Sequence, residues 1–346
     1  MSSPHVLVTG SAGFMGSHLV DALVARGDCE VYGVDDLSGG FERNVNPKSH
    51  FTVLDLRDGE KTKEYIHEVK PEIIFHLAAT ASVGLSQFTP IASTERNYNA
   101  YLNVLVPAVQ TGIMKRMILT SSMDVYGDQK PPFREEMERR PDDIYAIAKT
   151  AMEHATEVLA DVHRFEYVII RPHNVYGSRQ NLSDPYRNVV GIFINRLLQD
   201  KHYYIYGDGE QIRSFTDIDD FTPYILKVAF DPSCHRQIFN IGPKEEHTIN
   251  QLSDLILSAF FGSPRQTPEH LRPQHLPPRP KEVKEMYCTS EKAERMLGYH
   301  TTVPLEQGIM KMIAWAKEVG PQTPRYLESL EIVNDSTPET WRNKLI

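Results

Sequence analysis

A tyrosine and a lysine lie four positions apart in the stretch DDIYAIAKTAME, residues 142–153, which otherwise has the composition of a helix. Residues at positions i and i+4 share one face of a helix, so the phenol of Tyr145 and the ammonium of Lys149 can reach the same small volume. In a chain with sixteen tyrosines this spacing is expected about once by chance. The pair therefore gains its meaning from the residues around it.

Tyr145 and Lys149 together have the chemistry of a general base. A free tyrosine has a pKa of about 10, and an ammonium about 6 Å away, at an effective dielectric constant of about 20, lowers it by about two units. We therefore expect Lys149 to lower the pKa of Tyr145, so that the phenolate can remove a proton from a hydroxyl group. Ser121 and Ser122 follow an apolar run in LTSSMDVYG, and Ser122 is expected to hold the substrate oxygen.

Six short apolar or β-branched runs alternate with amphipathic stretches, and this alternation predicts the elements that position the pair. It is typical of βαβ units, so we expect an α/β fold with a doubly wound parallel sheet of the Rossmann type. In such sheets ligands bind beyond the carboxyl ends of the strands, where Ser122 is expected to lie. The predicted strands are residues 6–9, 30–34, 50–53, 72–77, 116–121 and 166–171.

A glycine-rich turn joins the first predicted strand to the first helix in VLVTGSAGFMGSHLVDAL, where Gly10, Gly13 and Gly16 have the spacing G-x-x-G-x-x-G. Glycines allow a tight turn and a close approach of a pyrophosphate to the free N–H groups of the helix. Asp35 follows the second strand and is expected to accept hydrogen bonds from an adenosine ribose. A carboxylate there favours NAD, because it would repel a 2′-phosphate.

Two later strand ends add expected contacts with the same cofactor. Asp55, in VLDLRD, follows the third strand and is placed to meet the adenine. Ala78 and Ala79, in FHLAAT, follow the fourth strand and offer small side chains against which a flat cofactor can lie. A Ser, a Tyr and a Lys then converge beside a nicotinamide, which suits transfer of a hydride from the carbon that bears the hydroxyl.

Composition excludes several other classes of protein. The net charge of −9 argues against nucleic-acid and anionic-membrane partners, and we expect no membrane span. Three cysteines, an odd number without C-x-x-C spacing, predict neither a disulfide framework nor a zinc site and favour the cytoplasm. The fourteen histidines are scattered, and we expect no metal site.

The rhythm of strands and helices breaks after about residue 175. We predict an NAD-binding domain over residues 1–175 and a smaller substrate-binding lobe over residues 176–320, from which some segments return to the main sheet. Residues 321–346 lack periodicity and are expected to pack on the surface or at a subunit contact.

Seven motifs spread over residues 5 to about 315 give the chain a family resemblance. It resembles the extended short-chain dehydrogenases/reductases of the NAD-dependent nucleotide-sugar epimerase and dehydratase group, with UDP-glucose/galactose 4-epimerases as the nearest type. The resemblance implies tightly bound NAD, a nucleoside diphosphate sugar as substrate, with UDP favoured, and a homodimer formed through helices near residues 91–112 and 143–161. The motifs are TGSAGFMGSHL, VDDLSGG, HLAA, TSSMDVYG, YAIAK, RPHNVYGSRQ and IYGDGEQIRSFTDIDD.

The resemblance also assigns residues to the two ligands. Asn174 and Arg213 would bind the diphosphate with Arg279 beside them, and Tyr206 would stack on the base. Surface salt bridging remains an alternative role for Arg279. Further substrate contacts are expected from Ser82, Ser122 and Val190. Further cofactor contacts are expected from Phe14, Met15, Leu37, Ser38, Gly39, Leu56, Leu77, Asn97, Tyr145 and Lys149.

The resemblance implies 4-epimerisation through a transient 4-keto sugar, with Ser122, Tyr145 and Lys149 as catalytic residues. Dehydratases of the group carry an Asp-Glu pair where this chain has Met123 and Asp124, and decarboxylases carry a Glu at the second position. Asp124 is therefore either a second acid/base or a solvated or backbone-bonded acid. A decarboxylase, dehydratase or 4-dehydrogenase remains the alternative activity, and a catalytically idle NAD-binding sensor or scaffold is a third possibility.

Two further positions bear on the sugar. Gly84 lies where uronic-acid enzymes of the group often have Arg, which favours a neutral sugar. His173 replaces an aromatic residue that is usual in galactose epimerases, so the identity of the sugar stays open.

Overall fold

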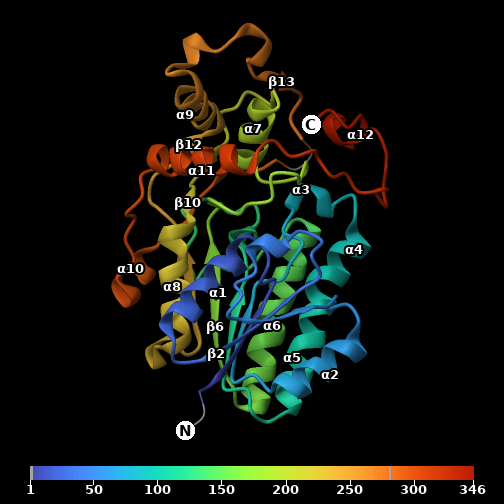
Figure 1. Cartoon of the computed structure of the whole chain (residues 1–346), viewed down its shortest axis with the longest axis vertical. Coiled ribbons are helices and arrows are strands. Elements are labelled where there is room, and N and C mark those ends of the chain that lie inside the picture. Colours follow the sequence, from blue (N-terminus) through green and yellow to red (C-terminus); the bar gives the residue numbers. More distant parts are fainter. Residues whose placement is uncertain (1–2, 280–281) are drawn as a thin grey trace.

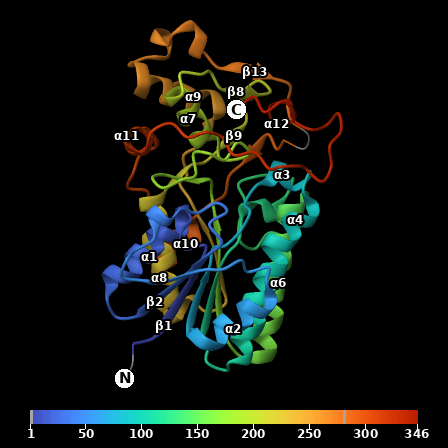
Figure 2. The ribbon, with the colours of Figure 1, turned by 45° about the vertical axis from the view of Figure 1, so that its right-hand side comes forward.

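A seven-stranded sheet forms the centre of the larger lobe in the computed structural model, which describes residues 3–279 and 282–346 (Figures 1 and 2). Every neighbouring pair of strands is parallel, and their order is β11-β6-β5-β4-β1-β2-β3. The chain changes direction across the sheet between β1 and β4. The strands are β1 (His5–Thr9), β2 (Glu30–Asp35), β3 (His50–Val53), β4 (Ile73–His76), β5 (Arg116–Thr120), β6 (Glu166–Pro172) and β11 (Gln237–Ile241).

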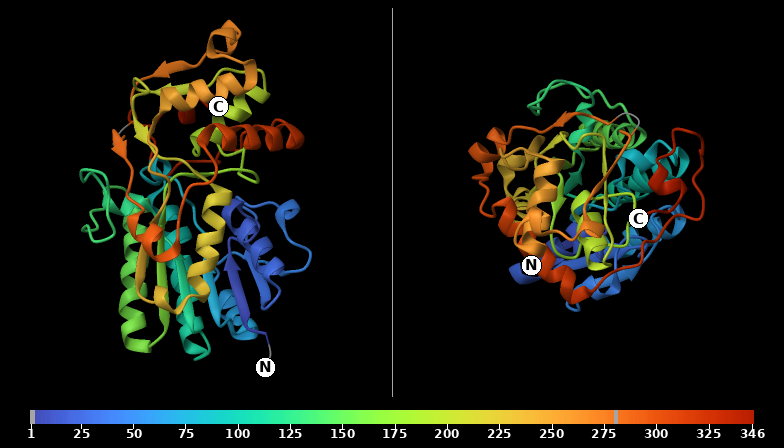
Figure 3. Two further views of the ribbon diagram at one scale, coloured as in Figure 1. Left: turned by 90° about the vertical axis from the view of Figure 1, so that its left-hand side faces the viewer. Right: turned by 90° about the horizontal axis from the view of Figure 1, so that it is seen from above.

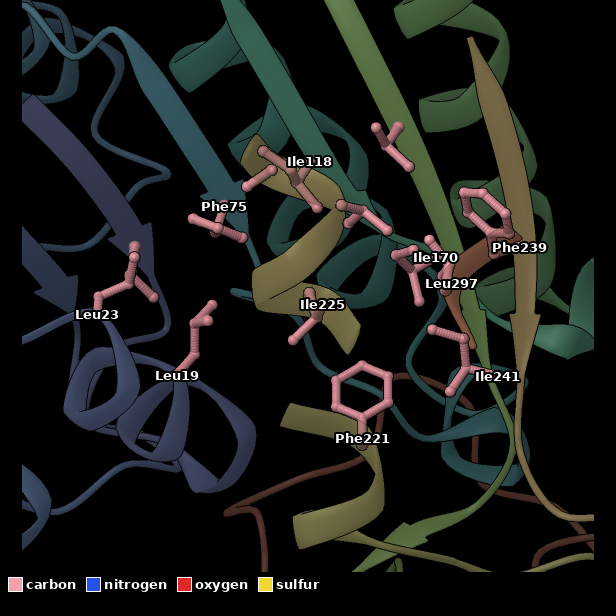
Figure 4. Packing of buried hydrophobic residues seen from close by; sticks show 14 of the residues in the cluster. Leu19, Leu23, Phe75, Ile118, Ile170, Phe221, Ile225, Phe239, Ile241 and Leu297 are labelled. Carbon is pink, nitrogen blue, oxygen red and sulfur yellow. The ribbon is translucent and has the colours of Figure 1, made fainter. Parts of the chain in front are cut away.

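Helices cover both faces of this sheet. One face carries α1 (Phe14–Arg26), α8 (Ile218–Phe230) and α10 (Glu291–Leu297), and the other carries α2 (Gly59–Val69), α5 (Ala100–Gln110) and α6 (Ile144–His163). Because successive strand residues point to opposite faces, Val6 and Val8 pack in the first core and Leu7 packs in the second. Figure 4 shows the first core, where Leu19 of α1 and Phe221 of α8 lie against the sheet.

The predicted α/β fold and all six predicted strands are confirmed, with ends that agree to within about one residue. The seventh strand, β11, was not predicted from the sequence. More than sixty residues separate β11 from β6, the strand with which it pairs, so no local βαβ pattern in the sequence predicts it.

The smaller lobe lies above the carboxyl edge of the sheet (Figure 3). Its core is formed by α7 (Val189–Leu198), α9 (Ile249–Phe261) and α11 (Leu305–Val319). Short strands join its loops in pairs and triplets: β8 (Tyr204–Tyr206) with β13 (Gln274–Leu276), β7 (Val175–Tyr176) with β10 (Thr216–Asp217), and β9 (Ile212–Arg213) between β12 (His247–Thr248) and β14 (Glu285–Met286).

Segments from both sides of residue 175 build the larger lobe, because α8, β11 and α10 contribute to its first core. The divisions near residues 175 and 320 therefore stay predictions about organisation along the chain. Residues 1–2, at the start of the predicted NAD-binding domain, lie outside the described residues.

Several short elements lie between the main strands and helices. They include α3 (Val83–Ser86), α4 (Pro90–Thr94) and a π-helical turn at Glu95–Asn99. Single 3₁₀ turns occur at Glu42–Asn44, Met123–Tyr126, Pro232–Cys234, Pro264–Gln266 and Glu269–Leu271. After α11 the chain runs across the molecule above α3 to α12 (Glu339–Arg342), as the red trace in Figure 1 shows. In the described part of the chain, every helix is too short or too polar to cross a membrane.

Candidate active site

A cleft of about 830 Å³ opens between the carboxyl edge of the sheet and the smaller lobe. The loops that follow β1, β2, β3, β4 and β5 line one half of it, and residues of the smaller lobe and the C-terminal segment line the other. This is the position at which open parallel sheets bind their ligands. We call the two parts the sheet half and the upper half.

The glycine turn after β1 leaves no room for side chains. Gly10 has a φ of +71°, and a Cβ there would lie 2.9 Å from the backbone nitrogen of Ala78. A Cβ on Gly16 would lie 2.0 Å from the carbonyl oxygen of Gly10. Helix α1 begins at Phe14, its N-cap Gly13 offers no side-chain acceptor to the first N–H groups, and this first turn lines the cleft. The turn therefore has the shape and the donors that a pyrophosphate requires.

Asp35 lies at the end of β2 on the wall of the sheet half. One carboxylate oxygen accepts a hydrogen bond from the Ala12 amide at 3.0 Å, and the other accepts one from the Leu37 amide at 2.8 Å. Burial raises the pKa of this carboxyl group above its usual range. Asp55, after β3, also lies on the wall, and the Arg57 guanidinium binds both of its oxygens.

Most other predicted cofactor residues lie on the same wall, but two do not. Asn97 is fully buried, and its carboxamide accepts a hydrogen bond from the Thr80 amide and donates one to the Ser93 carbonyl, so it supports the loop after β4 from behind. Leu37 adopts a left-handed backbone with a φ of 59°, and its neighbours Asp36 and Ser38 face the cleft in its place. The wall includes Phe14, Met15, Ser38, Gly39, Leu56, Leu77, Ala78 and Ala79.

Ser122, Tyr145 and Lys149 come together on the cleft wall at the junction of the two halves. Helix α6 begins at Asp143, whose carboxylate accepts a hydrogen bond from the Ala146 amide at 2.9 Å, and this places Tyr145 in the first turn. The ammonium of Lys149 lies 5.8 Å from the centre of the Tyr145 ring and donates a hydrogen bond to the Thr120 carbonyl at 2.8 Å. The structure thus brings together the two head groups that the helical spacing predicted.

Asp124 is partly exposed and is bonded to a side chain as well as to the backbone. The Ser122 hydroxyl donates a hydrogen bond of 2.5 Å to its carboxylate, within the 3₁₀ turn that follows β5. The Asp124 amide donates in return to the Ser122 oxygen at 3.2 Å. Met123, between them, is buried in a small apolar cluster. Ser122 and Asp124 both line the cleft, so the bonded pair faces the space in which a substrate would lie.

The electrostatics of this cluster correct one expectation. Burial raises the pKa of Tyr145 well above its usual value, and the negative charge of Asp124 raises it further. Burial also lowers the pKa of Lys149 to about 7. The sequence argument counted the attraction between ammonium and phenolate but not the cost of burying both groups, and the desolvation cost is the larger effect in this structure.

Asp143, a second carboxyl group next to this cluster, has a pKa close to that of Lys149. Burial, and then the charge of Asp124, raises the pKa of Asp143 to about 7. The Ser86 hydroxyl links α3 to the start of α6, because it donates to the Asp143 carboxylate at 3.4 Å and accepts a hydrogen bond from the Tyr145 amide at 3.2 Å. Sequence reasoning missed both residues, although an Asp directly before a predicted helix is a signal for an N-cap.

The predicted diphosphate residues lie in the upper half. Asn174 donates a hydrogen bond to the Ser214 carbonyl, and Arg213 donates to the carbonyls of Ile212 and Val283. Both line the cleft, and the hydrogen-bond acceptors of Arg213 are uncharged carbonyls.

Arg279 forms the ion pair that its alternative role implied. Its guanidinium binds Glu282 at 2.9 Å and lies 4.9 Å from the centre of the Tyr206 ring, while both Arg279 and Tyr206 line the cleft. The Tyr206 hydroxyl shares a 2.5 Å hydrogen bond with Thr340, a residue of the C-terminal segment.

Ser82 lies on the wall, but Val190 does not reach the cleft. Val190 lies in the first turn of α7 and is fully buried in the core of the smaller lobe, because the apolar face of this helix turns inward. The structure adds Arg187, whose guanidinium donates to the Ala81 carbonyl at 3.1 Å, and a group from the C-terminal segment. The C-terminal residues on the cleft wall, which no local pattern predicted, include Arg325, Leu327, Ser329, Glu331, Pro338 and Trp341.

Comparison with known proteins agrees with this geometry. A UDP-glucose 4-epimerase of Mycolicibacterium smegmatis is 34% identical over 315 residues, which are 89% of this chain and 96% of that protein. A UDP-N-acetyl-α-D-glucosaminuronate decarboxylase of Bacillus cytotoxicus is 30% identical over 323 residues, 90% of this chain and 98% of that protein.

Solved structures have the same fold over the same length. The UDP-glucose 4-epimerase of Thermotoga maritima, determined with UDP-glucose, matches with a TM-score of 0.84 and 32% identity, covering 91% of this chain and 99% of that one. The Thermus thermophilus UDP-glucose 4-epimerase in complex with NAD matches with a TM-score of 0.82 and 31% identity, covering 90% and 99%.

The model of the NAD dependent epimerase/dehydratase family matches residues 6–242, a span that runs from the glycine turn through β11. The glycine cradle, Asp35 and the Ser122, Tyr145 and Lys149 cluster all fall within it. The chain therefore belongs to the NAD dependent epimerase/dehydratase family, and NAD is its cofactor.

Proposed function

We propose that this protein is a nucleotide-sugar 4-epimerase that acts on a UDP-hexose. The observation that carries the proposal is the position of Ser122, Tyr145 and Lys149, which join a cofactor cradle to an arginine-bearing upper half within one cleft. Relatives of this chain include UDP-glucose 4-epimerases, one of which was crystallised with UDP-glucose. Arg213 supplies a cation for a diphosphate in an acidic protein.

The chain's own residues would move one proton and hold the reacting oxygen. NAD, when bound, would supply the hydride acceptor and donor for inversion at C4 of the sugar. Tyr145 accepts the proton of the C4 hydroxyl as the hydride leaves and gives it back when the ketone is reduced. The Ser122 hydroxyl donates to the reacting oxygen. The positive charges of the oxidised nicotinamide and of the Lys149 ammonium would both favour the phenolate and would oppose the rise in its pKa that burial causes.

Residues after Ser122 bear on the alternative reactions. Met123 is buried and apolar and has no proton to transfer, so 4,6-elimination lacks one member of the acid pair. The carboxylate of Asp124 accepts a hydrogen bond from the Ser122 hydroxyl, and Gly84, where uronic-acid enzymes of the group often have Arg, favours a neutral sugar over a uronate. One relative, 30% identical, is a decarboxylase, so decarboxylation is the second candidate reaction. Net oxidation by a 4-dehydrogenase is a further candidate.

Product analysis tests the proposal. The purified protein would be incubated with UDP-, GDP-, dTDP- and CDP-hexoses, and the products would be identified by NMR. Inversion at C4 of a UDP-hexose, with no net NADH and no CO₂, is the expected result, and Tyr145→Phe should abolish it. Release of CO₂ from a UDP-uronate, or accumulation of NADH, would instead assign one of the alternative reactions.

We also propose a cytoplasmic homodimer formed through α5 and α6. Ile147, Val158 and Val162 lie on one face of α6 and are exposed, as is Val106 on α5. Three free thiols fit a reducing compartment. Light scattering after size exclusion should give twice the chain mass, and Val158→Glu should give the monomer mass. A monomer for the unmodified chain would contradict the dimer.

A further inference from the structure

The C-terminal strap, residues 325–341, crosses the mouth of the cleft and contacts both lobes. At its start the Arg325 amide donates to the Ser183 carbonyl of the smaller lobe at 2.7 Å. Further along, the Glu331 amide donates to the Phe88 carbonyl at 2.9 Å, beside α4 of the larger lobe. The strap ends at α12, where Thr340 bonds the Tyr206 hydroxyl. Figure 1 shows this course above α3.

Trp341 is a strap residue whose side chain is inserted between the lobes. Only 5% of its surface is exposed, yet it lines the cleft. Its indole makes edge contacts with Phe88 of the larger lobe and Tyr186 of the smaller lobe, with ring centres 5.9 and 5.3 Å apart. Leu85 and Leu330 complete this apolar cluster. The indole therefore forms a fixed wall and is not a loose surface group.

The wall stands against Gly84 of α3. A Cβ built on Gly84 would lie 3.1 Å from the indole, so the ring occupies the volume that a side chain at residue 84 would enter. Two residues later, the Ser86 hydroxyl accepts the hydrogen bond of the Tyr145 amide. Helix α3 thus connects the indole to the reacting end of the cleft, and Gly84 and Trp341 share one boundary of the space available to a sugar.

We propose that Trp341 is a specificity-determining residue that limits the size of the sugar substituent the cleft accepts. The inference rests on the proposed function, because it assumes that the sugar lies beside Tyr145. An apolar wall discriminates between ligands that differ by a small group by roughly 10- to 200-fold. The indole should therefore favour a plain hexose over one that carries an acetamido group.

Equilibrium binding measures this directly. UDP-glucose and UDP-N-acetylglucosamine would be titrated by calorimetry into NAD-loaded Tyr145→Phe protein, in which the bound sugar is not converted. We expect this protein to prefer UDP-glucose. Adding Trp341→Ala should shift the ratio of the two dissociation constants by about 10-fold or more toward the acetamido sugar, and Trp341→Phe should give a smaller shift.

Two further variants distinguish a steric effect of the Trp341 indole from a general effect on the packing of the strap. Leu330→Ala removes a similar apolar group from the same cluster without opening the space at Gly84, and should leave the ratio within about twofold. Gly84→Ala should weaken UDP-glucose binding in the presence of Trp341 but much less in the Trp341→Ala background.

The outcomes are distinct. A ratio that Trp341→Ala leaves within twofold, or that Leu330→Ala shifts equally, overturns the inference, as does equal binding of both sugars before any change at Trp341. Wild-type protein that converts no UDP-hexose refutes the proposed function, and this result is read from turnover and not from binding.

Discussion

The two halves of the cleft are built in different ways. The sheet half consists of consecutive strand ends, and its walls are backbone: a Cβ on Gly10 or Gly16 would collide with main-chain atoms. The upper half gathers side chains from positions as distant as Asn174, Arg279 and Trp341. Its contacts are hydrogen bonds and aromatic contacts between segments far apart in the chain.

We expect the sheet half to bind the cofactor that every relative needs and the upper half to recognise a substrate that can differ between relatives. A backbone cradle binds the constant part of a dinucleotide, and a single substitution there disturbs the fold itself. Side chains of the upper half can change one at a time, because each contributes one contact. We therefore expect large, all-or-none effects near the sheet half and smaller, graded effects in the upper half.

The largest effect should come from Tyr145→Phe, at the junction of the halves. Loss of the proton acceptor should lower kcat by roughly 10²- to 10⁴-fold, while KM changes little because the ring remains in place. Tyr32→Phe, a partly exposed tyrosine on β2, is the matched control and should retain full activity. Steady-state kinetics with a UDP-hexose provides the measurement. Equal activity of both variants would remove Tyr145 from the mechanism.

Asp143 should make the stability of the sheet half depend on pH. Its pKa is about 7 in the folded protein and about 4 in the unfolded chain, so the folded state binds more protons between these values. The stabilisation is present at pH 4 and is lost as the pH rises through 7. Relative to Asp143→Asn, which keeps the helix cap, the wild type should lose about 3 kcal/mol between pH 4 and 8.

Urea unfolding of the two proteins across this range measures the difference. Asp36→Asn, which removes a partly exposed carboxylate after β2, is the control for the loss of one negative charge. A constant difference between wild type and Asp143→Asn would show that Asp143 titrates normally in the folded state.

The sequence predicted the sheet half far better than the upper half, for a physical reason. Gly10, Asp35 and Tyr145 belong to local patterns, in which a strand, a turn and a helix are adjacent in the chain. Trp341 and Arg187 reach the cleft through tertiary packing that leaves no local period. Val190 was expected to contact the substrate, but its side chain packs in the core of the smaller lobe.

For Tyr145 and Lys149, the local sequence pattern predicted the positions of the side chains better than it predicted their pKa values. The spacing of Tyr145 and Lys149 correctly placed two head groups together. It did not predict that both would be buried enough for desolvation to govern their pKa values, since burial depends on the lobe above them.

In the upper half, Arg213→Ala tests whether effects are graded. Losing one charge-assisted contact with a diphosphate should raise KM by roughly 10- to 100-fold and change kcat by less than about threefold. Arg279→Ala should have a smaller effect, because Glu282 already binds that guanidinium. Kinetics of both variants with a UDP-hexose gives the comparison. A loss confined to kcat would place Arg213 in the chemistry and break the division between the halves.

The smallest effect should come from Glu331→Gln, which weakens the strap without touching its wall residue Trp341. The Glu331 carboxylate accepts hydrogen bonds from the amides of Ile91 and Ala92 at 2.8 Å, at the start of α4. Such contacts with free N–H groups at a helix start contribute about 1 kcal/mol, and the amide keeps one of the two acceptors.

Proteolysis within the strap should therefore become about two- to fivefold faster, since a change of about 1 kcal/mol in local opening has that effect. Glu328→Gln, an exposed residue three positions earlier, carries the same change of charge and should leave the rate unaltered. The rate at which a low concentration of thermolysin releases the C-terminal segment can be followed by mass spectrometry. If both variants are cleaved at the wild-type rate, the Glu331 carboxylate does not hold the strap, and the closure of the upper half depends on the main-chain hydrogen bonds of the strap, the Tyr206–Thr340 hydrogen bond and the aromatic contacts of Trp341.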